Sequence, residues 1–166
     1  MLAEAPPAAR LILRGSETVR VSCGMAFGAD LPSRLGLAGE GARRAALWLG
    51  PDEWLLIAEG ADAAEIGGVL ESVLEGIAHS LADVSHRQIG LVASGPAAAR
   101  VLNAGCPLDL DLKTFPIGFA TRTLFDKVEI VLWRRAEATF HIEIWRSFAP
   151  YLASSLVEAA RGAPHW

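Results

Sequence analysis

The sequence contains little cysteine and no long apolar run. Only Cys23 and Cys106 occur, far apart and outside any CxxC spacing, which predicts a reduced, cytoplasmic protein. No apolar stretch approaches the roughly 18 residues that a membrane span requires. The first residues, MLAEAPPAARLILRG, lack a basic region ahead of a long apolar core, so we expect no signal peptide.

An excess of positive charge is also missing. The net charge of -4 at pH 7 gives no electrostatic footprint for nucleic acid. The sequence contains no GxGxxG, GxxxxGK(S/T) or GxSxG pattern, which argues against dinucleotide, nucleotide and serine-hydrolase sites. We therefore expect no catalytic, cofactor-binding or metal-binding residues on this chain, and neither nucleic acid nor a membrane as a partner.

Residues 47–58, LWLGPDEWLLIA, place two adjacent carboxylates between two tryptophans. Neighbouring side chains on a strand point to opposite faces, so Asp52 and Glu53 are poorly placed for acid–base work. Gly50, Pro51 and Asp52 are typical tight-turn residues. The segment therefore predicts a β-hairpin and not a pair of catalytic acids.

The 166 residues, 52% of them apolar, suffice for a core without disulfide or metal. Alternation predicts a strand over 18–27, and a long Gly-rich loop follows over 28–44. Apolar spacing predicts a helix over 61–77. Ser94 and Ser147 are expected to cap two further helices, each with a proline in its first turn. Three more strands are predicted at 119–125, 127–135 and 138–146.

A hairpin followed by a helix occurs twice along the chain. We interpret this repeat as an α+β fold built from duplicated β-α-β subdomains with exchanged strands. The expected organisation is a single compact domain of two pseudo-repeat halves, about 11–85 and 86–161. The repeat lies in the hydrophobic pattern and not in residue identities.

Two sets of polar residues could carry chemistry. Asp109 and Asp111 share one face of an extended segment, where they suit a cation, an amine or simply a solvated strand edge. His141 and Glu143 share a strand face. With His79 and His86 they could build a metal site only if the fold brought them together.

Tryptophan and arginine are the stronger signal. Core packing explains any one of the 5 tryptophans, but their number leaves room for one or two at a partner surface, and both residue types dominate protein interfaces. The residues alone therefore favour a subunit of an assembly.

Several segments together resemble the gamma subunits of heterotetrameric sarcosine oxidases: LWLGPDEWLLIA, ADVSHRQ, VLNAGCPLDLDLKTFPIGFATRTLFDKVEIVLWRR and RSFAPYL. The resemblance implies a non-catalytic subunit supporting assembly, with alpha, beta and delta subunits as partners and chiefly the large alpha-type subunit. The implied complex oxidises sarcosine to glycine and passes the one-carbon unit to tetrahydrofolate. It carries FAD, FMN, NAD, zinc and tetrahydrofolate on its other subunits. A paralogous complex acting on a related N-methyl amino acid is a further reading.

More remotely, DVSHRQIGLVASGPAAARVLNAG resembles the folate-binding domain of the glycine-cleavage aminomethyltransferase. That likeness implies the duplicated fold and leaves an alternative: a stand-alone folate-binding or aminomethyl-transfer protein using Asp109 or Asp111. For the subunit reading, we expect seven residues to face a partner: Trp54, His86, Arg87, Pro107, Asp109, Phe115 and Arg146.

Overall fold

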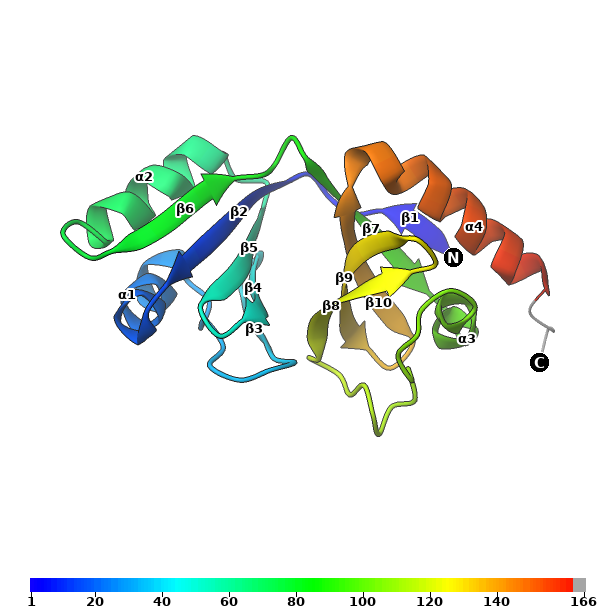
Figure 1. Ribbon diagram of the computed structural model, residues 1–166. Helices are drawn as coiled ribbons and strands as arrows, with labels where there is room; N and C mark the ends of the chain where they lie inside the picture. Colours follow the sequence, from blue (N-terminus) through cyan, green and yellow to red (C-terminus); the bar gives the residue numbers. More distant parts are fainter. Residues whose placement is uncertain (163–166) are drawn as a thin grey trace. The chain divides into compact units, whose positions relative to one another are not determined.

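The computed structural model describes residues 1–162, which form two compact units (Figure 1). One, here called the continuous unit, spans Pro6–His86. The other, the split unit, combines Met1–Ala5 with the chain from Arg87 onward. Within the described residues, no helix is both long enough and apolar enough to cross a membrane.

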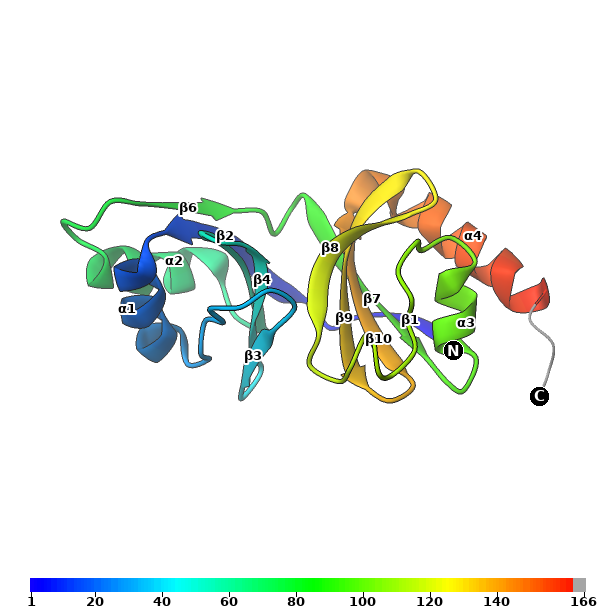
Figure 2. The ribbon, with the colours of Figure 1, turned by 60° about the horizontal axis from the view of Figure 1, so that its bottom comes forward.

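The continuous unit is a five-stranded antiparallel sheet with two helices on one face (Figures 1 and 2). The strands lie in the order β3-β4-β5-β2-β6. Leu13, Trp54 and Leu56 are fully buried between sheet and helices, at 0–1% exposure. The elements are β2 (Ala8–Gly15), α1 (Glu17–Phe27), β3 (Ala38–Gly41), β4 (Arg44–Gly50), β5 (Glu53–Glu59), α2 (Ala63–Val73) and β6 (His79–Asp83).

The split unit has the same plan. Its strands lie in the antiparallel order β1-β7-β10-β9-β8, and α3 and α4 cover one face. Leu102, Phe140 and Leu152 are fully buried in its core. The elements are β1 (Leu2–Glu4), β7 (Gln88–Ser94), α3 (Ala98–Asn103), β8 (Ala120–Phe125), β9 (Val128–Ala136), β10 (Thr139–Trp145), the 3-10 helix η1 (Arg146–Phe148) and α4 (Ala149–Gly162).

The two sheets match strand for strand, since β8, β9, β10 and β7 repeat the order of β3, β4, β5 and β2. The place of β6 is taken in the split unit by β1, which pairs with β7 through Leu2–Ala93 and Glu4–Leu91. An N-terminal strand thus completes the sheet of the C-terminal half. The predicted α+β fold with duplicated subdomains and exchanged strands is confirmed. The single compact domain with halves at about 11–85 and 86–161 stays a prediction.

The strand predicted over 18–27 is wrong, because this segment is the helix α1. Val19, Cys23 and Phe27 are each 0% exposed and recur every fourth residue, the period of one helix face. Gly28 ends the helix in a left-handed conformation, with φ 78°. The strand was predicted because polar and apolar residues also alternate in this segment.

The Gly-rich segment 28–44 is shorter as a loop than expected, because β3 lies within it. The glycines of β3 allow close backbone contact with the segment that follows α1. A Cβ on Gly39 would lie 1.7 Å from the Asp30 carbonyl oxygen, and one on Gly41 would lie 2.0 Å from that of Gly28. Glycine is therefore required here for space.

The hairpin over 47–58 and the helix α2 are confirmed. Pro51 and Asp52 form the turn, and the Asp52 carboxylate accepts a hydrogen bond from Arg14 at 3.0 Å. The two expected serine caps are wrong. The chain turns at Gly95 (φ 117°) before α3 begins, and Ser147 lies inside η1.

We predict that Gly39→Ala lowers the free energy of unfolding by about 1–3 kcal/mol, because the new methyl group meets backbone that cannot rotate away. Gly68→Ala is the matched control, since nothing lies within 4 Å of a Cβ there and the residue is inside α2. It should raise the free energy of unfolding by about 0.5–1 kcal/mol. Urea unfolding followed by circular dichroism measures both, and equal effects would contradict the packing argument.

We predict a pH dependence of stability centred on His79. Its Nδ1 contacts the Ile77 carbonyl at 2.7 Å and its Nε2 contacts the Glu71 carboxylate at 3.0 Å, with the side chain 14% exposed. The hydrogen bond to Ile77, aided by Glu71, raises the pKa of His79 above its usual range. A raised pKa stabilises the fold below the unfolded value of about 6.5, and the gain is lost as pH rises through the folded value.

Unfolding curves from pH 5.5 to 8.5 should therefore show stability falling with pH in the wild type, and less so in His79→Gln. Glu71→Gln should show an intermediate slope, because the Ile77 carbonyl still accepts a hydrogen bond from His79 Nδ1–H and keeps the pKa of His79 raised. Identical slopes for the wild type and His79→Gln would refute the assignment.

Candidate partner interface

Two of the residues expected at a partner surface lie in the cores. Trp54 is 1% exposed, and its indole N–H donates to the Pro32 carbonyl at 2.7 Å. Phe115 is 2% exposed and packs on Phe119 and Phe140, with ring centroids 4.7 and 6.3 Å away. Their expected place at an interface is therefore not supported by the structure.

The other five expected residues are exposed, but they do not form one group. Arg87 and Arg146 meet at the C-terminal end of β10, where the Arg146 N–H donates to the Arg87 carbonyl at 2.7 Å. Pro107 and Asp109 lie on the loop whose Phe115 packs near the start of β10. His86 is the last residue of the continuous unit.

The group at the end of β10, here called the Trp145 cluster, consists of Arg87, Trp145, Arg146 and Phe148. The Arg87 guanidinium lies 5.1 Å from the centre of the Trp145 ring. The Phe148 ring lies 6.3 Å from that ring. Trp145 is 42% and Phe148 44% exposed, so much of their apolar surface faces solvent.

Strand alternation and the end of the strand together explain why Trp145 is outside the hydrophobic core. Phe140, Ile142 and Ile144 point toward the helix-covered face, so Trp145 belongs to the other set of side chains on β10. It is also the last residue of the strand, and η1 turns the chain at once so that Phe148 follows on the surface. The sequence predicted Arg87 and Arg146 at a partner surface, but not Trp145 or Phe148.

Tyr151 is a further exposed aromatic residue, on α4. It is 41% exposed, and its hydroxyl donates to the Asp126 carboxylate. That hydrogen bond raises the pKa of Tyr151, so the hydroxyl stays protonated. The side chain is thereby held in one position, which reduces the entropy lost when a partner binds.

The arrangement is suited to binding a protein. Tryptophan, tyrosine and arginine are the residues that most often dominate interface energies. An exposed cation–π pair contributes about 0.5–1 kcal/mol, and more once a partner removes water from it. The cluster thus offers apolar contact area together with positive charge.

Asp109 and Asp111 lie in an irregular segment outside any strand, directly before the turn at 112–114. The Asp109 carboxylate accepts from the Asp111 N–H and from the Thr114 hydroxyl, each at 3.0 Å. The Asp111 carboxylate accepts from the Lys113 N–H at 3.0 Å. Both acids therefore shape their own loop, although they remain exposed.

A buried arginine fixes this loop. Arg134 is 3% exposed and donates to the carbonyls of Phe115 at 2.6 Å and Leu110 at 3.1 Å. Its guanidinium also lies 4.6 Å from the centre of the Phe140 ring. Burial lowers the pKa of Arg134. Arg134 continues the alternation of the core residues Val128, Ile130 and Leu132 along β9. This alternation was the sequence signal that could have predicted its burial.

The polar residues considered for a metal site are divided between the two units, with His79 and His86 in the continuous unit and His141 and Glu143 in the split unit. His141 and Glu143 form a buried pair, with 2.7 Å between Nε2 and Oε1. His79 belongs to the continuous unit and pairs with Glu71. Among residues 1–162, no three His, Cys, Asp or Glu side chains form a group that could hold a metal ion.

Comparison with known proteins adds to this geometry. The sarcosine oxidase, gamma subunit family matches residues 16–161. The sarcosine oxidase subunit gamma of Corynebacterium sp. (strain P-1) is 36% identical over 135 residues, which are 81% of this chain and 66% of that protein. The chain thus spans just under two thirds of the length of the curated relatives it matches.

Solved structures show the same likeness. Heterotetrameric sarcosine oxidase from Corynebacterium sp. U-96, in complex with pyrrole 2-carboxylate, contains a chain with a TM-score of 0.91 and 31% identity. The match covers 100% of this chain and 87% of that one. The glycine cleavage system aminomethyltransferase T of Bartonella henselae has a TM-score of 0.71 at 18% identity, covering 96% of this chain and 46% of that one. This second match shows the fold alone.

We predict opposite outcomes for the same substitution at two tryptophans. Trp54→Phe should lower the free energy of unfolding by about 1–3 kcal/mol, because it leaves a void and strips the Pro32 carbonyl of its donor. Trp145→Phe should change it by no more than about 0.5 kcal/mol, because the ring is half exposed. Urea titrations followed by circular dichroism decide this. A large loss for Trp145→Phe would show that the ring is structural.

Proposed function

We propose a function from one premise: the chain belongs to the sarcosine oxidase gamma subunit family. It acts as a gamma-type, non-catalytic subunit that supports the assembly of a sarcosine oxidase complex. The match over residues 16–161 is the observation that carries the proposal. The likeness along the whole chain to part of a heterotetrameric enzyme supports it.

In the proposed complex, chemistry belongs to the partner subunits. They oxidise sarcosine to glycine and pass the one-carbon unit to tetrahydrofolate. FAD, FMN, NAD and zinc are held there and not on this chain. The partners are alpha, beta and delta subunits, with the large alpha-type subunit as the main contact, and the complex is cytoplasmic.

The Trp145 cluster is our choice for the contact surface. Its two rings supply an apolar centre, Arg87 places positive charge against the Trp145 ring, and the exposed Arg146 follows Trp145 in the sequence. A complementary partner surface therefore has an apolar patch bordered by carboxylates. The alternative of a stand-alone folate-binding or aminomethyl-transfer protein is less favoured, because Asp109 and Asp111 are engaged in their own loop.

The test is co-expression of the tagged chain with the neighbouring genes of its genome. We expect a yellow complex that contains this chain and releases peroxide when given sarcosine. Omission of the chain should reduce the yield of assembled complex while leaving the flavin on the other subunits. A colourless protein that elutes alone would refute the proposal.

The contact surface has its own test. Arg87→Glu combined with Trp145→Ala should weaken binding in the complex roughly thirtyfold or more, because the loss of even one hot-spot residue costs about 2 kcal/mol or more. Arg34→Glu is the control, an exposed arginine in the continuous unit. Equal recovery for both variants would exclude the Trp145 cluster as the contact surface.

A further inference from the structure

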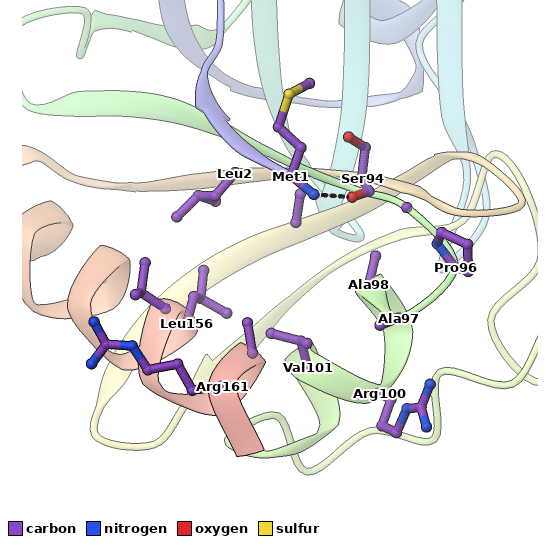
Figure 3. A pocket seen from close by; sticks show the side chains of 14 residues that line it. Met1, Leu2, Ser94, Pro96, Ala97, Ala98, Arg100, Val101, Leu156 and Arg161 are labelled. Carbon is purple, nitrogen blue, oxygen red and sulfur yellow. Dashed lines mark hydrogen bonds between the residues drawn. The ribbon is translucent and has the colours of Figure 1, made fainter. Parts of the chain in front are cut away.

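The split unit contains a groove that the Trp145 cluster does not explain. It lies between β1, the turn after β7, α3 and the C-terminal half of α4, and encloses about 810 Å³ (Figure 3). Trp145 and Phe148 precede α4, whereas Leu156, Val157 and Arg161 of its second half line the groove. The two surfaces are therefore separate.

Small side chains open this groove. Ala97 and Ala98 lie at the start of α3, and Ala160 lies on α4, so a gap remains between the elements. Leu156, 3% exposed, forms part of the floor, and Val157 is left 45% exposed. Apolar surface thus faces solvent in a concave site, an arrangement typical of a binding surface.

Positive charge borders the groove on two sides. Arg100 comes from α3 and Arg161 from α4, and Figure 3 shows both guanidinium groups directed away from the apolar centre. None of the described residues lining the groove carries a carboxylate. Arg161 pairs with Glu158 at 3.0 Å, but both side chains are about three-quarters exposed, so that pair is weak.

We propose that this groove binds an apolar segment of a partner subunit, flanked by carboxylates that pair with Arg100 and Arg161. An apolar centre with a charged rim is the usual plan of a protein interface. A small-molecule site would instead direct its few polar groups inward, toward the ligand. The inference rests on the proposed function, since it requires the complex.

The experiment places a photo-crosslinking p-benzoylphenylalanine at Val157 in the co-expressed complex. Val69 is the matched control, because it is a helical valine of similar exposure (47%) on α2 of the continuous unit. We expect the label at position 157 to crosslink to another subunit, within a peptide that is apolar and flanked by Asp or Glu. The label at position 69 should not reach that peptide.

Charge reversal gives a second readout. Arg100→Glu combined with Arg161→Glu should weaken recovery of the complex several-fold, whereas Arg34→Glu should not. A complex that assembles while position 157 crosslinks to a second copy of this chain, or to no polypeptide, overturns the groove proposal and leaves the proposed function intact. Failure of the unlabelled wild-type chain to form any complex overturns the proposed function, and the groove proposal with it.

Discussion

The alternation of side chains along antiparallel strands is the constraint on which the rest of the structure depends. In the split unit it sends Phe140 and Ile142 toward the helices, and His141, Glu143 and Trp145 to the opposite set. The pairing of β10 with β7 and β9 fixes this division. A slip of one residue would place a histidine and a glutamate in the apolar core, at a cost of several kcal/mol.

The same constraint connects fold to function. Trp145 belongs to the same set as the buried His141 and Glu143, but it is the last residue of the strand, so its ring lies half exposed beside Arg87. The 3-10 turn then brings Phe148 near it before α4 begins. Exposed aromatic rings of this kind promote self-association of a free chain. In the proposed complex, a partner subunit would cover these rings.

Much of the fold follows from local patterns. Turn chemistry located the hairpin at Pro51–Asp52, and helical spacing located α2. The strand predicted over 18–27 was wrong because the segment fits two periods. Polar and apolar residues alternate there as in a strand, and the apolar ones also recur every fourth position as in a helix. The proposed contact surface, the Trp145 cluster, was harder to predict. Trp54 and Trp145 both lie on hairpin strands, but Trp54 packs in the core beneath the helices, whereas Trp145 is the last residue of its strand. That difference depends on tertiary packing, which local sequence does not contain.

The exchange of β1 into the C-terminal half affects how the chain is made. Leu2–Glu4 are translated before the continuous unit, yet their partner residues Leu91–Ala93 emerge only after all of it. That unit is complete by His86 and is free to fold during synthesis, whereas β1 must wait. Strand β1 is therefore translated before the continuous unit but pairs after it. A bulky domain fused ahead of β1 would affect the closing of the split unit's sheet more than the folding of the continuous unit, which follows β1 directly in the sequence.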